Sequence, residues 1–372
     1  MYTLGINAVF HDSAACIVKD GQLLAAAEEE RFTHIKHGKR PVPFTAYELP
    51  FHAIDYCLQV AGIHLSEVDH IAYSFDPAYL LPKEDVPALV TLPLQASEVA
   101  PVTQPEEIYP GWNSLFLAYL TNAPSQLVDG YPHHLRKRLS GLKAGDLKWH
   151  YVEHHLAHAA SAFFPSPYYN AAVLTLDGRG ERATTAYYAG RGTTMEKLGT
   201  VNMPHSLGML YEHVTTYLGF LHSSDEYKVM ALASYGQPEY VDYFRSLIHV
   251  ADNGTYKIDP LQLEEKFGQP RQSGDPFTAL HFDIAHSLQK VLEETVLKLV
   301  DWLHAQTGME NLCLAGGVAL NCVLNSVIRD KGPFKNVWVQ PAAGDAGTAL
   351  GAALWIDAQE LQHKGQTDCV YA

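Results

Sequence analysis

The chain has 372 residues, of which 47% are hydrophobic and 18% charged, a composition typical of soluble globular proteins with an extensive core. The length predicts two or three domains. The formal net charge of -15 argues against nucleic acid as the main partner, because such binding depends on clustered lysines and arginines. The 5 cysteines show no paired spacing, which argues against a disulfide framework or a zinc knuckle. Without a signal peptide or an apolar run of about 18 residues, we expect a cytoplasmic protein that does not span a membrane.

The N-terminal segment predicts a three-stranded meander. Strands are expected at 2–7, 16–18 and 23–27, with polar residues that include His11 and Asp12 gathered in the first turn. The same order of elements returns at 171–176, in the polar turn 177–182, and at 183–188. This repetition predicts a duplicated α/β domain, with two lobes around a cleft.

The other elements fit this plan. We expect a helix at 43–62 that stops at Gly62, a strand at 71–75, and a helix at 283–306 with Asp283 as its N-cap and Gly308 as its stop. Residues from about 76 to 148, rich in proline and aromatics, predict a helical insertion that covers a core edge or shapes acceptor specificity. The expected lobes are 1–168 and 169–372.

A histidine pair and an aspartate are the candidate metal ligands. His154 and His158 are four residues apart, so on a helix both imidazoles project from one face and can bind one ion. Asp177 follows an apolar strand, at the end where α/β proteins expose reacting groups. Two nitrogens and one carboxylate suit an open metal site. A chance pair is the ordinary alternative in a chain with 20 histidines, and His155 is expected behind the site or at the surface.

Two glycine-rich turns predict a nucleotide site. Gly316 and Gly317 follow a strand at 311–315 and lead into a helix that continues through Asn325, so backbone amides can approach a phosphate or ribose. After a strand at 337–340, Gly344 and Asp345 open a helix of small residues. Two such turns on consecutive β-α units favour nucleotide binding more than either alone.

A further polar group lies at 224–228. Asp225 and Lys228 frame a short acidic segment beside apolar residues. This pattern is either a surface ion pair, which contributes little to stability, or a contact to the acceptor or nucleotide.

These motifs together resemble one known family. They are EHHLAHAASA (153–162), LDG (176–178), DEYKVM (225–230), GGVALN (316–321) and GDAGTALG (344–351), with GIN (5–7), HDSAA (11–15) and the 29–37 stretch. The joint pattern, which runs from residue 2 to about 356, resembles the NodU/CmcH family of O-carbamoyltransferases. The resemblance implies a Kae1-like member of the actin/sugar kinase/Hsp70 superfamily, in which two lobes enclose a nucleotide.

The resemblance also implies an activity and its residues. The family moves a carbamoyl group from carbamoyl phosphate, through a carbamoyl-adenylate made with ATP, to a hydroxyl of an acceptor. Its metal ligands correspond to His154, His158, Asp177 and Asp345, around an iron-type divalent ion. Nucleotide contacts are expected from Gly178, Lys228, Gly316, Gly317, Asn321 and Gly344. The catalytic candidates are His11, Asp12, Lys36 and Asp225, with His11 or Asp225 as the base and Lys36 on the carbamoyl oxygen or a phosphate.

The sequence departs from the pattern of this family in one large feature, and several alternative functions stay open. Full-length members continue into a YrdC-like domain that makes carbamoyl-adenylate, and this chain stops at Ala372, where that domain would begin. The chain is therefore either a truncated piece or a transferase half that receives the intermediate from a separate YrdC-like protein. A small-molecule kinase, a Kae1/TsaD-like tRNA threonylcarbamoyl transferase and a non-catalytic binding subunit stay open as alternatives. Neither the acceptor nor the oligomeric state follows from the sequence.

Overall fold

The computed structural model describes residues 1–38, 49–79, 114–129 and 143–362. The chain divides into two compact units. Unit 1 consists of Met1–Pro165, Gly180–Arg182 and Gly344–Ala372, and unit 2 consists of Ser166–Arg179 and Ala183–Ala343. The boundary expected after residue 168 lies close to the point where the chain passes from unit 1 to unit 2, between Pro165 and Ser166. The C-terminal segment differs from the prediction, because it belongs to unit 1 and not to the second lobe.

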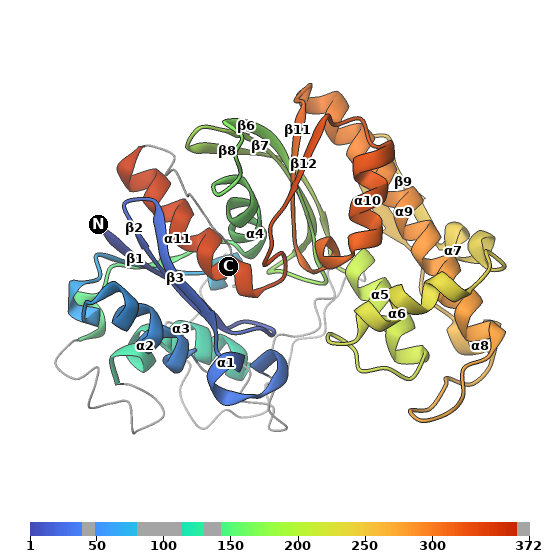
Figure 1. Ribbon diagram of the computed structural model, residues 1–372, viewed down its shortest axis with the longest axis horizontal. Helices are drawn as coiled ribbons and strands as arrows, with labels where there is room; N and C mark the ends of the chain where they lie inside the picture. Colours follow the sequence, from blue (N-terminus) through green and yellow to red (C-terminus); the bar gives the residue numbers. More distant parts are fainter. Residues whose placement is uncertain (39–48, 80–113, 130–142, 363–372) are drawn as a thin grey trace. The chain divides into compact units, whose positions relative to one another are not determined.

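Unit 1 combines one sheet with helices (Figure 1). Its strands are β1 (Tyr2–Asn7), β2 (Ala14–Lys19), β3 (Gln22–Glu28), β4 (His70–Tyr73) and β5 (Trp149–Tyr151). Its α-helices are α1 (Glu30–Thr33), α2 (Phe51–Ala61), α3 (Ser114–Asp129), α4 (His154–Phe163) and α11 (Ala346–Leu361). Short 3-10 turns include η1 (Lys36–Gly38) and η4 (Pro77–Tyr79).

The sheet of unit 1 has the strand order β3-β2-β1-β4-β5. β1 pairs antiparallel with β2, and β2 with β3, so the predicted meander is confirmed. β1 also pairs parallel with β4, and β4 with β5. Because parallel strands end at the same edge of a sheet, the loops that follow β1, β4 and β5 emerge together.

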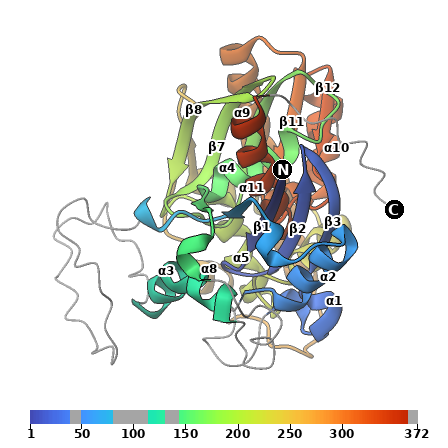
Figure 2. The same ribbon diagram turned by 90° about the vertical axis from the view of Figure 1, so that its left-hand side faces the viewer.

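The two faces of this sheet are covered by different helices. Leu4 and Ile6 of β1 belong to a buried apolar cluster that includes Ile54 of α2 and Leu127 of α3. Thr3, one position away and therefore on the opposite face, hydrogen-bonds Asp357 of α11. Figure 1 shows α2 and α11 on opposite sides of β1–β3, and the turned view in Figure 2 shows α2 beside β2 and β3.

Helix α11 packs closely on both β1 and α4 because two glycines stand at the contacts. A Cβ on Gly5 would overlap the carbonyl oxygen of Ala349 in α11. A Cβ on Gly351 would overlap the carbonyl oxygen of Ala157 in α4 and lie 2.7 Å from the backbone nitrogen of Ser161. This close packing on the first sheet explains why α11, which follows the last strand of unit 2, belongs to unit 1.

Replacing Gly351 with alanine is expected to lower the free energy of unfolding by about 1–3 kcal/mol, because overpacking forces α4 and α11 apart. Denaturant unfolding measures the change. Gly145→Ala is the matched control in unit 1, since a Cβ there would meet nothing within 4 Å. Equal stability of the Gly351→Ala variant and the wild type would contradict this contact.

Unit 2 contains a second five-stranded sheet. Its strands are β6 (Asn170–Leu176), β7 (Ala183–Arg191), β8 (Thr194–Asn202), β11 (Asn311–Ala315) and β12 (Asn336–Val339), and a small hairpin is formed by β9 (Ile248–Val250) and β10 (Tyr256–Ile258). Its helices are α5 (Leu207–Tyr217), α6 (Glu226–Leu232), α7 (Val241–Leu247), α8 (Leu263–Phe267), α9 (Ala279–Thr307) and α10 (Cys322–Lys331), with 3-10 turns η7 (Ala233–Tyr235) and η8 (Gly317–Leu320).

The second sheet repeats the topology of the first. Its order is β12-β11-β6-β7-β8, in which β6, β7 and β8 form an antiparallel meander while β6, β11 and β12 run parallel. Each sheet thus consists of three meander strands followed by two parallel strands added beside the first. The repetition confirms the predicted duplicated α/β fold.

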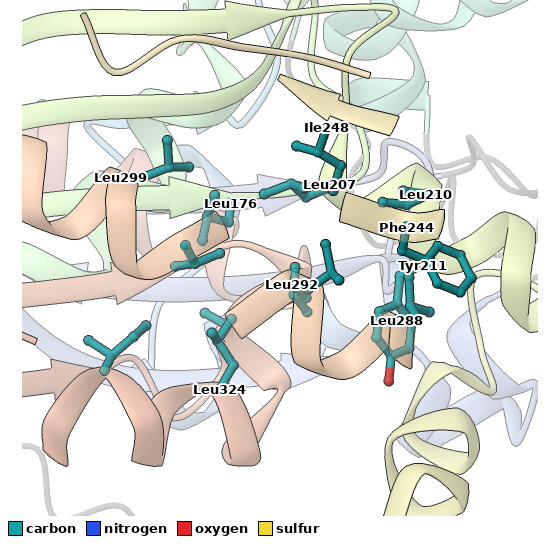
Figure 3. Close-up of a cluster of buried hydrophobic side chains, with 14 of the residues drawn as sticks. Leu176, Leu207, Leu210, Tyr211, Phe244, Ile248, Leu288, Leu292, Leu299 and Leu324 are labelled. Carbon is teal, nitrogen blue, oxygen red and sulfur yellow. The ribbon is translucent and has the colours of Figure 1, made fainter. Parts of the chain in front are cut away.

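The core of unit 2 lies between its sheet and the long helix α9. Leu174 and Leu176 of β6 belong to one buried cluster with Leu288 and Leu292 of α9. Figure 3 shows several of these side chains, together with Leu324 of α10. The sheet and helices that present the candidate residues of unit 2 are therefore held by one continuous apolar core.

The ends of two helices, α9 and α2, can be compared with the predicted boundaries. The prediction of Asp283 as the N-cap of α9 is wrong, because Thr278 occupies that position and forms a capping box with His281. The stop of α9 at Gly308 is confirmed by its left-handed φ of 60°. Gly62 likewise ends α2 with φ 68°, whereas the expected start of that helix at 43 lies outside the described residues.

The expected insertion at about 76–148 is described in part. It contains the helix α3, which agrees with the predicted helical character. Residues 80–113 and 130–142 of this stretch lie outside the described residues.

Candidate metal and ligand-binding site

Three side chains with metal-ligating atoms converge in unit 1. His154 and His158 are one turn apart on α4, and Asp345 is the N-cap residue of α11. The two Nε2 atoms are 3.1 Å apart. Nε2 of His154 lies 3.5 Å from Oδ1 of Asp345, and Nε2 of His158 lies 3.4 Å from the same oxygen. The three side chains are 0 to 1% exposed, so their polar atoms face one another away from solvent.

The loop after β4 orients the ring of His154. Its Nδ1 lies 3.3 Å from the carbonyl oxygen of Ser74, which can only accept, so Nδ1 carries the proton and Nε2 keeps its lone pair. The hydroxyl of Ser74 donates to Oδ1 of Asn7 at 3.0 Å and receives a hydrogen bond from Thr348 at 2.9 Å. The ends of β1 and β4 and the first turn of α11 are thereby bonded together.

A buried carboxylate that the sequence reasoning missed caps the start of α4. Oε1 of Glu181 accepts hydrogen bonds from the backbone nitrogens of His154 at 2.9 Å and Asp76 at 2.8 Å. Burial raises the pKa of Glu181 to about 7, against the opposing effect of His154. Its position in the polar turn after the strand of Asp177 was the available signal, but nothing in the sequence shows that this carboxylate reaches back to α4.

His155 is fully buried, so the expectation that placed it at the surface is wrong. Its ring lies edge-on to those of His154 and His158, with centroids 6.0 Å and 6.1 Å away. The alternative expectation, a position behind the pair, agrees with this packing.

Asp12 connects two imidazoles in the loop after β1. Its carboxylate accepts from Nδ1 of His11 at 2.8 Å and from Nδ1 of His37 at 2.6 Å. Although burial opposes ionisation, these hydrogen bonds hold the pKa of Asp12 well below its usual range. Nε2 of His11, left with its lone pair, lies 3.8 Å from Oδ2 of Asp345. His11 therefore stands beside Asp345, with Asp12 fixing its tautomer.

The surrounding loop is tightly constrained. Nδ2 of Asn7 donates to the carbonyl oxygens of both His11 and Asp12 at 3.1 Å. Asp12 adopts the left-handed φ of 53°, which is unusual for a residue other than glycine and is common at functional sites. Lys36, the candidate for the carbamoyl oxygen, is exposed and directly precedes His37.

In unit 2, Asp177 meets the first glycine turn. Asp177 follows β6 directly and is 6% exposed, and its Oδ1 accepts a hydrogen bond from the backbone nitrogen of Gly317 at 2.7 Å. Gly316 has a φ of 95°, and a Cβ on it would overlap the carbonyl oxygen of Leu176. This hydrogen bond connects the loop after β6 to the loop after β11. Asp177, a predicted metal ligand, therefore lies against the glycine turn that is predicted to bind a nucleotide.

Helix α5 fixes the residue that follows Asp177. The carbonyl oxygen of Gly178 accepts a hydrogen bond from the hydroxyl of Ser206 at 2.7 Å, and Ser206 also caps α5. A Cβ on Gly208 would lie 2.7 Å from the backbone nitrogen of Gly178, so the loop and the helix are in close contact. In unit 1, Gly344 is buried next to Asp345 and accepts a hydrogen bond from the backbone nitrogen of Gly347 at 3.1 Å.

The side chain of Asn321 serves the local structure. Its Oδ1 accepts from the backbone nitrogen of Leu324 at 2.9 Å, which caps α10. Its Nδ2 donates to Oε1 of Gln289 at 2.7 Å. If the side-chain amide of Asn321 also contacts a nucleotide, it does so either in addition to these hydrogen bonds or in place of them.

Asp225 and Lys228 pair with each other. Nζ of Lys228 lies 2.9 Å from Oδ2 of Asp225, and this oxygen also accepts from the backbone nitrogen of Leu221 at 3.2 Å. The hydrogen bond that Lys228 donates to Asp225 raises the pKa of Lys228. Because Lys228 is 41% exposed, the pair stabilises the fold little, and its ammonium group stays accessible.

A second ion pair, which the sequence reasoning did not single out, follows Gly178. Arg179 donates from one terminal nitrogen to Oε2 of Glu212 at 3.2 Å. Oε1 of Glu212 accepts from His222 at 2.9 Å and from Ser223 at 2.5 Å. Although burial raises it, these donors and the charge of Arg179 bring the pKa of Glu212 below its usual value.

The family model of the carbamoyltransferase N-terminus matches residues 2–354. The chain belongs to this family. The resemblance inferred from the motifs is thereby confirmed.

Two curated relatives of this carbamoyltransferase-family chain show similarity over nearly its whole length. The uncharacterized protein sll1178 of Synechocystis sp. is 41% identical over 98% of this chain and 58% of its own length. The nodulation protein NolNO of Sinorhizobium fredii is 37% identical over 94% of this chain and 47% of its own length. The chain therefore spans about half the length of these relatives. Among solved structures, component A of the (R)-2-hydroxyglutaryl-CoA dehydratase of Acidaminococcus fermentans aligns over 97% of this chain and 99% of its own, with a TM-score of 0.45 and 12% identity.

The three converging side chains of this family member fit a divalent cation. One ion with ligand bonds of about 2.0–2.2 Å requires donor atoms roughly 3–4 Å apart. The observed separations of 3.1, 3.4 and 3.5 Å agree with this requirement. Two imidazole nitrogens and a carboxylate suit zinc, iron and other first-row metals. Asp177, the fourth expected ligand, belongs to unit 2.

No helix in the described part of this family member is long and apolar enough to cross a bilayer.

Proposed function

We propose that the chain transfers a carbamoyl group from carbamoyl-adenylate to a hydroxyl group of a small-molecule or natural-product acceptor. The observation that carries this proposal is the convergence of His154, His158 and Asp345 beside His11 in a member of the carbamoyltransferase N-terminus family. A small-molecule kinase of the same fold would have no need for the histidine pair.

His154, His158 and Asp345 would hold a divalent cation, with Asp177 as the fourth ligand on the strength of the family resemblance. An iron-type ion is our proposal for its identity, since imidazole and carboxylate together suit iron. When bound, the cation supplies Lewis-acid stabilisation of negative charge on a phosphate oxygen. The hydrogen bond from Nδ1 of His154 to Ser74 keeps the ring turned for this role.

The glycine turns are proposed to bind the nucleotide. Gly178, Gly316 and Gly344 present backbone to a phosphate or ribose without a side chain in the way. Lys228 supplies a partly exposed ammonium group, and Gly317 and Asn321 complete the expected set. The hydrogen bond between Gly317 and Asp177 keeps this turn in place.

Proton transfer falls to His11 in this proposal. The acceptor hydroxyl gives its proton to Nε2 of His11, and its oxygen forms a bond to the carbamoyl carbon. The bond from that carbon to the phosphate oxygen breaks, and AMP leaves with the electron pair. Asp12 orients His11 and stabilises its protonated ring, and Lys36 is proposed to stabilise the carbamoyl oxygen. Asp225 is the alternative base.

The source of carbamoyl-adenylate is a further proposal. Carbamoyl phosphate and ATP would yield it either in the remainder of a longer protein or in a separate YrdC-like partner. We place the reaction in the cytoplasm and propose no membrane partner. We propose no nucleic-acid partner either, because the net charge of -15 would repel a polyanion. Assembly into an oligomer is compatible with this scheme.

The direct test supplies the protein with synthetic carbamoyl-adenylate, a ferrous salt and a panel of hydroxylated acceptors, and follows the products by mass spectrometry. We expect acceptors whose mass rises by one carbamoyl group, together with stoichiometric AMP. Phosphorylated acceptors formed from ATP alone would favour the kinase alternative. Tight, salt-sensitive tRNA binding with transfer of a threonylcarbamoyl group would favour the tRNA-modifying alternative.

A further inference from the structure

Arg179 has binding capacity that its ion pair does not use. Among the described residues, its guanidinium group makes one hydrogen bond, from a terminal nitrogen to Glu212. A guanidinium group carries five N–H donors in a planar fork that matches phosphate oxygens. The side chain is 39% exposed, so the remaining donors can reach a ligand.

The position of this arginine is fixed from two sides. Its neighbour Gly178 is held by the hydroxyl of Ser206 and lies against Gly208 of α5. Glu212 is one turn further along the same helix, so the helix that holds the loop also holds the guanidinium group. Glu212 is only 15% exposed and is itself fixed by His222 and Ser223. The ion pair therefore orients Arg179 more firmly than two exposed side chains could.

Charge gives a reason for a cation at this place. The chain has a formal net charge of -15, so its overall field repels nucleotides. Binding a phosphate then requires local cations near the turns that approach it. Arg179 directly follows Asp177 and Gly178, and Asp177 is hydrogen-bonded to the glycine turn at Gly317.

We propose that Arg179, oriented by Glu212, binds a phosphate group of the nucleotide that the chain uses. This inference rests on the proposed function, because it presumes that the turns at Gly178 and Gly316 bind a nucleotide. The inference assigns a phosphate-binding role to Arg179, which the sequence motifs did not indicate. Glu212 is in this proposal a positioning residue.

The experiment compares the affinities of AMP and adenosine for the wild type and for Arg179→Ala by isothermal titration calorimetry. We expect Arg179→Ala to weaken AMP binding about 10- to 100-fold, the usual effect of a charge-assisted hydrogen bond. Adenosine affinity should change less than about twofold, because adenosine has no phosphate for the guanidinium group. Arg179→Lys, which keeps the charge but not the fork, should recover part of the AMP affinity.

Arg191→Ala is the matched control, since Arg191 forms an exposed ion pair with Glu196 in the same unit. Equal AMP affinities of the wild type and Arg179→Ala would overturn the inference, as would equal losses for AMP and adenosine. An Arg179→Lys variant that folds but binds AMP as weakly as Arg179→Ala would also count against it. Failure of the wild type to bind either ligand would instead contradict the proposed function on which the inference rests.

Discussion

Replacing His158 with alanine is expected to release the divalent cation and to lower carbamoyl transfer by at least about 100-fold. Loss of a residue that merely supports a metal ligand typically costs 10- to 100-fold in affinity or activity, so loss of a ligand should cost no less. Nε2 of His158 faces both Nε2 of His154 and Oδ1 of Asp345, so its removal takes away one of the three converging donor atoms. Metal analysis of protein loaded with ferrous iron under anaerobic conditions measures the first effect, and mass spectrometry of the product measures the second.

His155→Ala provides a closely matched control for this variant. It removes the same ring from the same helix at a position that is also 0% exposed. Both variants should lose stability through the cavity they create, by about 2–5 kcal/mol. We expect His155→Ala to keep its metal, because His155 is outside the converging group. Full metal content in His158→Ala would contradict the assignment of His158 as a metal ligand. Equal metal loss in the two variants would show that the loss results from impaired folding.

Replacing His11 with alanine is expected to lower kcat by about 10²- to 10⁴-fold, the usual contribution of a general base. The bound metal should remain, since the three converging ligands are untouched. Asp12→Asn should cause a smaller loss, because it keeps His11 while weakening the hydrogen bond that fixes the ring. Single-turnover carbamoylation from carbamoyl-adenylate, together with metal content, separates these effects.

Exogenous imidazole gives an independent check on His11. If this ring accepts the proton of the acceptor, added imidazole should restore part of the rate in His11→Ala and none in His158→Ala. Asp225→Asn tests the alternative base. A rate for His11→Ala within about threefold of the wild type, combined with a large loss in Asp225→Asn, would transfer the role to Asp225.

Local features of the fold followed directly from the sequence. The run 2–7 predicted the first strand, and Gly62 and Gly308 predicted helix ends, because each depends on only a few neighbouring residues. The repeated strand-turn-strand order predicted the duplication. The four-residue spacing of the histidine pair predicted that both rings share one face of a helix, as they do.

Features that depend on distant contacts did not follow. The packing of α11 in unit 1 requires Gly5 and Gly351 to meet backbone from other elements, which no local pattern shows. Asp283 looked like a helix start because it is an acidic residue before an apolar periodic stretch, yet Thr278 formed the better capping box.

The candidate site shows the same limit. Glu181 reaches the first amide of α4 from a turn far along the chain, and its role depends on that contact. Arg179 was indistinguishable from any polar turn residue until Glu212 was seen beside it. Motif comparison identified residues by type and spacing, whereas partners that orient them became evident only from coordinates.

The repeated sheet topology also bears on where the candidate metal ligands lie. α4 follows the last strand of the first sheet, and α11 follows the last strand of the second, so the two helices are counterparts. His154 opens one helix, and Asp345 opens the other. The starts of two corresponding helices therefore supply candidate ligands from distant parts of the sequence.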